Sequence, residues 1–224
     1  MTHIVRVVVS ILALAGLLAA APAANALELG VASKPEEASC PENCQAVGQV
    51  SGYQLRIGEM VNPFRAPGRG KITAFTVTLG TPTERQRSFF TSTFGGAPKA
   101  RISVLRRGSG RRHRLTGHSP VVELTPHLGS THTFTLERPL TVKEGYVVAL
   151  TVPTWAPAFA VGRARDEGWR SSRDFRRCAD VRQQAAQQRR ASLRTYGCFY
   201  RTSRLLYTVT FEPAAPAEPP PPAS

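Results

Sequence analysis

Acidic residues are scarce in this sequence: its 224 residues include 15 Asp and Glu against 29 Lys and Arg, for a formal net charge of +14. Glycoside hydrolysis ordinarily needs two carboxyl groups facing one bond, and the spacing of candidates such as Glu59 and Glu123 favours no such pair. The GxSxG, HExxH and P-loop motifs are also absent, which removes common signatures of catalytic and phosphate-binding sites. We therefore expect no enzyme activity, with a hydrolase on a jelly-roll scaffold as an alternative.

Histidine is equally sparse beyond the first segment. The four histidines that follow it are spread over turns, a basic loop and one alternating segment. A single His in such a place is more often a packed structural residue than a general base. We expect no catalytic residue among them. They are His113, His118, His127 and His132.

A long apolar run is absent after the first segment, so we expect no membrane span in the rest of the chain. The first segment combines Arg6, an apolar run over residues 7–21 and the small residues Ala24-Asn25-Ala26. These are the parts of a secretory signal peptide, whereas a membrane anchor would have a longer run and a positively charged end. We predict a signal peptide over residues 1–26, a mature chain that begins at Leu27, and a secreted, extracellular protein.

The chain divides into a folded part and a short tail. Residues 213–224 are rich in Pro and Ala without an apolar pattern, which predicts a disordered tail. The remaining length suits one domain with a real core. We expect an N-terminal segment over residues 27–48 and a β-sandwich domain over residues 49–212, with an excursion at residues 163–204.

Cysteine is limited to Cys40, Cys44, Cys178 and Cys198. In an exported chain four cysteines indicate two disulfides, with three possible connectivities. Residues four apart in a helical turn lie about 6 Å apart, within reach of a disulfide, so we predict Cys40–Cys44 and Cys178–Cys198. A metal site lacks a second thiol or His pair at ligand spacing. We expect no metal and no cofactor.

Several short segments alternate between apolar and polar residues, as half-buried strands do. Turn signals such as APGRG, FGGAP, RGSG and KEGY separate them. The predicted strands lie within residues 52–57, 71–79, 100–106, 131–137, 146–152 and 205–212.

This spacing, with no helical run before the C-terminal third, predicts an all-β, jelly-roll-like antiparallel β-sandwich. The stretch at residues 133–152, TFTLERPLTVKEGYVVALTV, is typical of a strand that leaves one sheet, turns at Gly145 and enters the other. We therefore expect two packed sheets.

Three stretches carry a resemblance to other proteins: CPENCQAVGQVSGYQL, NPFRAPGRGKITAFTVTLG and CFYRTSRLLYTVTF. Together they resemble secreted proteins of high-GC Gram-positive bacteria to which no activity is assigned. The resemblance spans most of the mature chain. It implies export and a β-sandwich fold, and it implies no function.

Basic charge is concentrated in two places. Residues 163–204 hold 12 arginines against four acidic residues, a local net charge of +8, and residues 106–114 read RRGSGRRHR. Such density attracts polyanions, including nucleic acid and anionic wall polymers. The plainer interpretation is a solvated basic face without a dedicated partner.

The segment between the last two cysteines, CADVRQQAAQQRRASLRTYGC, has a helix-forming composition. A helix over residues 179–194 would span about 24 Å, and the four residues that remain could return only about 14 Å. A disulfide therefore limits the helix to two or three turns, which we place at residues 180–188. We predict a partly helical excursion on the surface.

Trp169 stands beside Arg170 and Arg173 in a segment expected to be a polar loop, which suits stacking on a sugar ring or a base. The alternative is that Trp169 and Trp155 both cover the core, as most tryptophans do. The candidate ligand-binding residues are Trp169, Arg170, Arg173, Arg189, Arg190 and Arg194.

Together these features predict a secreted, monomeric binding or surface-interaction protein without catalysis. Its expected partner is an anionic wall polymer or a glycan. The alternative partner is nucleic acid or another polyanion, bound by the same face without stacking.

Overall fold

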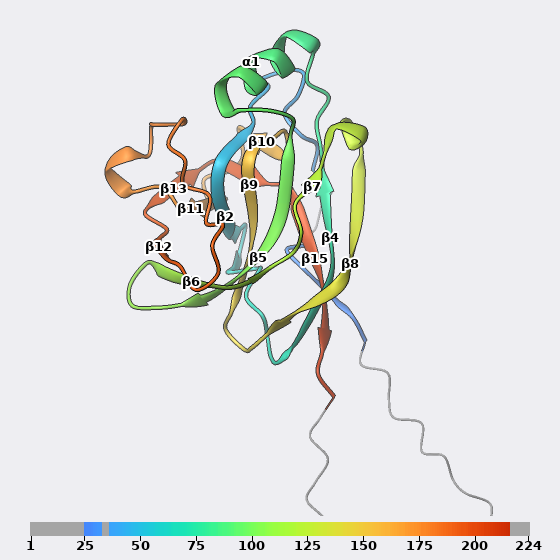
Figure 1. The fold of residues 1–224 in the computed structure, drawn as a ribbon, viewed down its shortest axis with the longest axis vertical. Helices are drawn as coiled ribbons and strands as arrows, with labels where there is room; N and C mark the ends of the chain where they lie inside the picture. Colours follow the sequence, from blue (N-terminus) through green and yellow to red (C-terminus); the bar gives the residue numbers. More distant parts are fainter. Residues whose placement is uncertain (1–24, 33–35, 216–224) are drawn as a thin grey trace, which may run out of the picture.

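The computed structural model describes residues 25–32 and 36–215 (Figure 1). It shows two packed antiparallel sheets, which confirms the predicted all-β sandwich. The predicted signal peptide at residues 1–26 and the tail after Pro213 lie almost entirely outside the described residues. Among the described residues, no helix has the length and apolar content needed to cross a bilayer.

The smaller sheet has four strands, and its alternating sequence follows the predicted pattern. In one of them Phe75 and Val77 are buried while Thr76 and Thr78 face outward. In order across the sheet the strands are β1 (Leu27–Leu29), β15 (Tyr207–Pro213), β4 (Gly70–Thr78) and β8 (Thr131–Val142).

The larger sheet supplies the other layer, and its central strand is buried on both faces, as the largely apolar segment at residues 146–152 predicts. The order of its main strands is β12 (Leu193–Thr195), β6 (Arg112–His118), β5 (Lys99–Arg107), β9 (Val147–Ala156), β2 (Val47–Ile57), β11 (Gly168–Ser171) and β13 (Cys198–Arg201). Two short strands also belong to it: β3 (Met60–Val61) pairs with β2, and β7 (Val122–Glu123) pairs with β5. A separate two-stranded sheet consists of β10 (Phe159–Val161) and β14 (Ser203–Leu205).

One α-helix, α1 (Glu84–Phe94), lies at the top of the sandwich in Figure 1. The expectation of no helix before the C-terminal third is therefore wrong. Thr83 and Gln86 form a reciprocal capping box at the helix start. Phe90 and Phe94, in the second half of the helix, are buried, and the Phe90 ring lies 5.1 Å from the Trp155 ring. The helix thus covers Trp155, which lies in the core.

Both predicted disulfides are present, Cys40–Cys44 and Cys178–Cys198, with Cα–Cα distances of 4.1 Å and 5.4 Å. The helix predicted at residues 180–188 is wrong, because helical structure in this part is limited to one 3-10 turn, η2 (Phe175–Arg177). A second 3-10 turn, η1 (Thr125–His127), precedes β8.

Residues 184–192, which we call the strap, run across the outer face of the larger sheet instead of forming a helix. The amide of Ala185 donates to Gln49 in β2, and Arg101 in β5 donates to the carbonyl of Gln188. Beyond them, Ala191 donates to Leu115 in β6. The strap therefore crosses several strands and is held by each in turn.

Beneath the strap lies a row of buried hydroxyl groups from three adjacent strands. Ser51 in β2 and Ser103 in β5 both lie 2.7 Å from the hydroxyl of Thr151 in β9. The amide of Gln187 donates to the Ser51 hydroxyl at 2.9 Å. Ala185, Gln187 and their neighbour Ala186 are buried. This part of the excursion is therefore packed on the sheet, contrary to the predicted solvated surface segment.

Candidate anion-binding site

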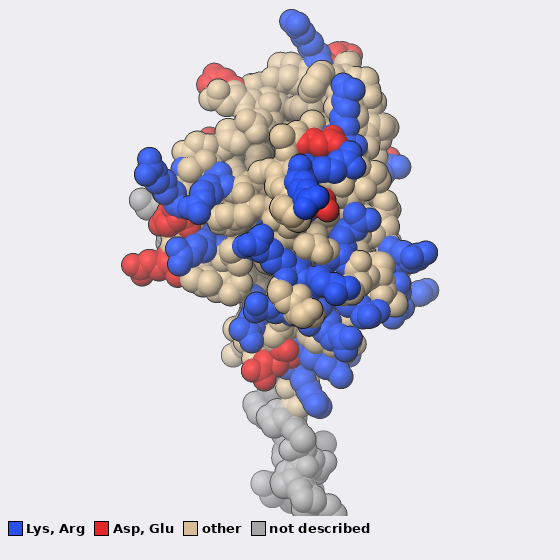
Figure 2. All heavy atoms as spheres, turned by 90° about the vertical axis from the view of Figure 1, so that its left-hand side faces the viewer, with Lys and Arg blue, Asp and Glu red and all other residues tan. Residues whose placement is uncertain are grey.

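A basin of about 620 Å³ lies on the outer face of the larger sheet, beside the strap. Its walls come from the β5–β6 hairpin, the turn before β9 and the segment after β3, and its floor comes from β2 and β11. Figure 2 views this side of the molecule and shows Lys and Arg side chains gathered over its lower half. The arginines that line the basin are Arg65, Arg106, Arg107, Arg111 and Arg170.

These five arginines have almost no local counter-charge. Glu144 is the single acidic residue among those lining the basin. Within residues 25–32 and 36–215, the ion pairs involve Arg163, Arg177 and Arg204, and none involves a basin arginine. Unpaired guanidinium groups gathered around one hollow create a strong local field for an anion.

The floor of the basin holds Tyr53 and His113, which are 5% and 3% exposed. Their rings lie 5.4 Å apart, and the Tyr196 ring packs against both. The Tyr53 hydroxyl lies 3.5 Å from Nε2 of His113. The other ring nitrogen, Nδ1, lies 3.2 Å from the carbonyl oxygen of Arg111, so it must carry the proton and donate. Nε2 is then free to accept from Tyr53.

Burial and the arginines together set the ionisation of these groups. Burial lowers the pKa of His113, and Arg107 and Arg170 lower it further, against the opposing hydrogen bond to the Arg111 carbonyl. Burial raises the pKa of Tyr53, while the positive charges of Arg170 and Arg107 pull it down. His113 is therefore neutral near pH 7, and the arginines stabilise any negative charge that develops on Tyr53.

Arg170 contributes the most enclosed of the basin guanidinium groups. It lies in β11 directly opposite Tyr53 in β2 and Phe199 in β13, and its guanidinium lies 5.4 Å from the Phe199 ring centre. Among the described residues, its buried Nη1 has no hydrogen-bond partner. Burial, followed by the charge of Arg111, lowers the pKa of Arg170. Arg170 also lines the basin, so its positive charge can attract an anion there.

Trp169, the predicted stacking residue, does not lie in a polar loop but in β11, where it is 4% exposed. Its indole N–H donates to the Ser203 hydroxyl at 3.1 Å, and its ring packs at 4.7 Å from the Tyr200 ring. It also lies close to the backbone of Gly52. Trp169 is therefore buried and not exposed in a polar loop, which fits the alternative interpretation, a core tryptophan, although it also lines a hollow of about 1140 Å³ together with Arg173 and Tyr200.

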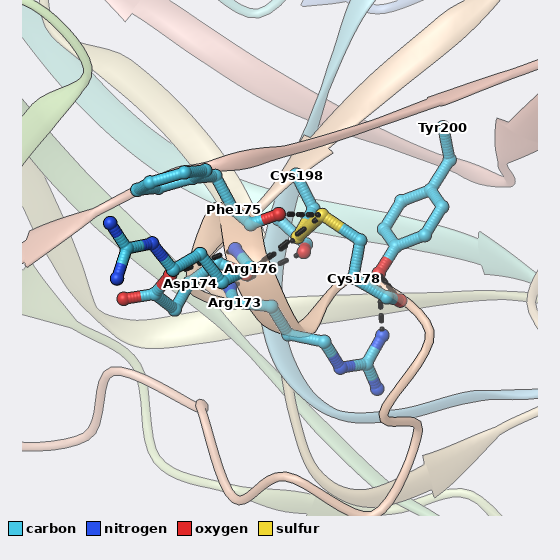
Figure 3. The surroundings of a disulfide bond; sticks show 8 residues. Arg173, Asp174, Phe175, Arg176, Cys178, Cys198 and Tyr200 are labelled. Atoms are coloured by element: carbon cyan, nitrogen blue, oxygen red, sulfur yellow. Dashed lines mark hydrogen bonds between the residues drawn. A yellow bond between two sulfur atoms is a disulfide. The ribbon is translucent and has the colours of Figure 1, made fainter.

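Arg173 was also predicted to face a ligand, but it is buried and its hydrogen bonds are made within the protein (Figure 3). Its guanidinium donates to the Tyr200 hydroxyl at 3.0 Å and to the Gly48 and Val181 carbonyls. Tyr200 in turn donates to the carbonyl of Cys178, beside the disulfide. Arg173 therefore anchors the disulfide-linked segment to the sheet, a structural role.

Arg189, Arg190 and Arg194 lie outside the basin. Arg189 and Arg190 are exposed at the end of the strap, and Arg194 is half-buried in β12, directly opposite His113 in β6. Arg189 and Arg194 line a separate hollow of about 370 Å³. Of the six predicted residues, the structure places only Arg170 in the basin.

Sequence reasoning missed Tyr53, His113, Arg107 and Arg111 as members of one site. The basic cluster at residues 106–114 was recognised, but its His was assigned to a loop, whereas it lies in β6. The basic residues were the available signal. Their convergence with Tyr53 depends on the strand order.

The other histidines do not join the basin. The rings of His127 in η1 and His132 in the edge strand β8 stack on each other with their centres 3.6 Å apart. Within the part of the chain that the structure describes, no three His, Cys, Asp or Glu side chains are placed to share a metal ion.

Comparison of this chain with protein-family models, with curated proteins and with solved structures found no match. The basin therefore has to be interpreted from its own chemistry.

Proposed function

We propose that the protein is secreted and binds an anionic polymer of the cell wall or an anionic glycan through the basin. The observation that carries this proposal is the set of five arginines around one hollow with a single carboxylate among the lining residues. Guanidinium groups bind carboxylates and phosphates in a bidentate manner, so either anion suits the site.

A polymer suits the surface better than a small anion, because basic hollows adjoin the basin. A hollow of about 330 Å³ shares Arg106 and Arg107 with it and adds Arg112 and Arg114. The hollow of Arg189 and Arg194 follows, sharing Leu193 with its neighbour. A chain with repeated negative charges can occupy several of these hollows at once, and each additional contact strengthens binding.

Nucleic acid is the alternative ligand, and the aromatic residues count against it. Proteins that bind single strands stack bases on exposed aromatic rings. In the basin, Tyr53 and His113 are buried and Tyr146 is half-buried. The aromatic side chains with the largest exposure, Phe89 and Phe175, do not line it. These residues favour a polymer recognised by its charges.

Secretion is part of this proposal. It is supported by the signal-peptide pattern at residues 1–26 and by two disulfides, which persist in oxidising compartments. N-terminal sequencing of protein from the culture medium should begin at or near Leu27. Recovery of the intact Met1 end from cytosol alone would contradict export.

Binding can be tested with the mature chain and two carboxylate polymers, alginate and polygalacturonate, over a salt series. The variant Arg107→Gln/Arg111→Gln/Arg170→Gln should bind at least about tenfold more weakly, equivalent to about 1.4 kcal/mol. Its affinity should also depend less on salt, because fewer charge contacts remain.

A charge-matched control is available among arginines that do not line the basin. Arg85→Gln/Arg87→Gln/Arg138→Gln removes the same charge from exposed positions on α1 and β8. It should bind as the wild type does. Equal losses in the two variants would show that only net charge matters and that the basin is not a site.

A further inference from the structure

We propose that the basin is also catalytic and cleaves a uronate-containing polysaccharide by β-elimination, with Tyr53 exchanging protons with the sugar ring. This inference rests on the proposed function, because the substrate must first bind through its carboxylates. It departs from the expectation of a protein without enzyme activity, which was drawn from the absence of sequence motifs. The chemistry here depends on side chains from separate strands.

The first requirement is a base that can remove the proton next to the uronate carboxylate. The Tyr53 hydroxyl lies 3.5 Å from Nε2 of His113, a long hydrogen bond of the kind that tightens when substrate fills a site. Because Nδ1 of His113 donates to the Arg111 carbonyl, Nε2 is the accepting nitrogen for the Tyr53 proton. Burial opposes this transfer, since it raises the pKa of Tyr53 and lowers that of His113, while the positive charges of Arg107 and Arg170 favour the tyrosinate. Tyr53 and His113 both line the floor of the basin.

The second requirement is positive charge at the sugar carboxylate, since removal of the C5 proton places negative charge on it. Arg107 and Arg170 both act electrostatically on Tyr53 and His113, and Arg111 acts on Arg170. These three arginines line the same basin as Tyr53 and His113. They are unpaired within the described residues and available to the substrate.

The step balances without a metal or an oxidant. His113 accepts the Tyr53 proton, and the resulting tyrosinate removes the proton from C5 of the uronate. The electron pair forms the C4–C5 double bond as the C4–O4 bond breaks. The departing O4 then takes a proton from Tyr53, and His113 returns its own proton to Tyr53. The products are an unsaturated uronate end and a new hydroxyl group.

Hydrolysis does not suit these residues. It ordinarily needs two carboxyl groups flanking the glycosidic bond, and Glu144 is the single acidic residue lining the basin. Elimination needs one proton-exchanging group and fixed positive charge, both of which the basin provides. Uronate polymers are therefore the substrate class that suits the basin.

The test uses alginate, polygalacturonate, hyaluronate and heparin, and follows the ultraviolet absorbance of the new double bond conjugated to the carboxylate. The wild-type chain should cleave at least one of the four. Tyr53→Phe should bind that polymer within about threefold of wild type and cleave it about 10²- to 10⁴-fold more slowly, as loss of an acid–base group does.

The role of His113 can be tested separately, through the pH dependence of the cleavage rate. In the wild type the rate should fall as pH drops, because protonated His113 can no longer accept from Tyr53. His113→Gln should lower the rate and remove this acidic limb of the pH profile. A purely structural role would reduce stability and leave the shape of the profile unchanged.

The two proposals fail differently. Binding that depends on the basin arginines, with no absorbance change for any of the four polymers, would overturn catalysis and leave the proposed function standing. Cleavage by Tyr53→Phe at the wild-type rate would overturn the assignment of Tyr53. If the wild type binds none of the polymers, cleavage of uronate polymers and the binding of carboxylate polymers through the basin are both overturned. Inactivity of Arg107→Gln/Arg111→Gln/Arg170→Gln, purified identically, controls for a contaminating enzyme.

Discussion

Tyr196 donates a hydrogen bond of 3.0 Å to Oε1 of Gln187, and both side chains are buried between the strap and the sheet. Nε2 of Gln187 donates in turn to the carbonyls of His113 and Ser192. Every polar atom of this amide thus has a partner within the protein. The Gln187 side chain thus links the strap to Tyr196 and to the backbone of β6.

Replacing Gln187 tests this arrangement. Gln187→Leu should lower the free energy of unfolding by about 1–3 kcal/mol, because the buried Tyr196 hydroxyl loses its acceptor and the His113 and Ser192 carbonyls each lose one donor. Urea unfolding gives the measurement. The adjacent, exposed Gln188 is a matched control, since Gln188→Leu should change stability by less than about 0.5 kcal/mol. Equal effects at both positions would show that the strap is not docked as described.

Replacing Trp169 distinguishes a structural role of this side chain from a ligand-binding role. Trp169→Ala should destabilise the fold by about 3–5 kcal/mol, the usual cost of removing a large buried aromatic side chain. At a temperature where the variant stays folded, its affinity for alginate should remain within a few-fold of wild type. A large loss of affinity without loss of stability would restore Trp169 as a ligand contact.

The two disulfides should contribute unequally. Replacing Cys178 and Cys198 with Ser should lower stability by roughly 3 kcal/mol in the chain-entropy description of a loop of this length. The Cys40–Cys44 bond closes a much shorter loop, and its double Ser variant should lose roughly 2 kcal/mol. Thermal unfolding of the two double variants, measured under non-reducing conditions, gives the comparison. The reverse order would contradict this account.

His113 should make the fold sensitive to acid. Its folded-state pKa lies below the ordinary value of 6.5, so in acid the unfolded chain binds a proton that the folded chain resists. Stability from this group is therefore complete above pH of about 6.5 and falls as pH drops below it. The charged and titratable groups around the ring are Tyr53, Tyr196, Arg107 and Arg170.

Denaturant unfolding between pH 7 and pH 5 measures this slope. His113→Gln should show a shallower loss of stability with acid than wild type, whatever its stability at pH 7. Parallel slopes in the two proteins would assign the acid sensitivity to other groups.

The strands were predictable where one face alone is buried. The alternation in residues 71–79 and 131–137 reports a local property of the chain, and β4 and β8 include these segments. The helix α1 was missed because only a few aromatic side chains mark its buried face. Its capping box at Thr83 and Gln86 was a readable signal that was not used.

The excursion was harder to predict, because its partners are remote in sequence. The Gln- and Arg-rich composition of residues 182–190 indicates helix, yet the backbone of Ala185 and Gln187 bonds to β2 instead. The disulfide argument correctly ruled out a long helix. It could not show the hydroxyl row of Ser51 and Thr151 on which the strap lies.

The candidate site could not be predicted from the sequence for a similar reason. Tyr53, His113 and Arg170 come from β2, β6 and β11, which are far apart in the chain. Their meeting depends on the order of the strands in the sheet, and alternation alone does not give that order. Charge density correctly marked residues 106–114 as unusual, but density does not tell which side chains converge.

The route of the strap has a consequence for how the molecule matures. Side chains that hold it, those of Ser51, Arg101 and Arg114, precede their partners by 136, 87 and 77 residues. Contacts of such long sequence separation form late, because the loops between them must close first. We expect a folding intermediate in which the sheets are paired while the strap and Tyr196 are still undocked. In that intermediate Tyr196 does not yet pack against Tyr53 and His113 on the floor of the basin, so full ligand affinity should appear only with the last step of folding.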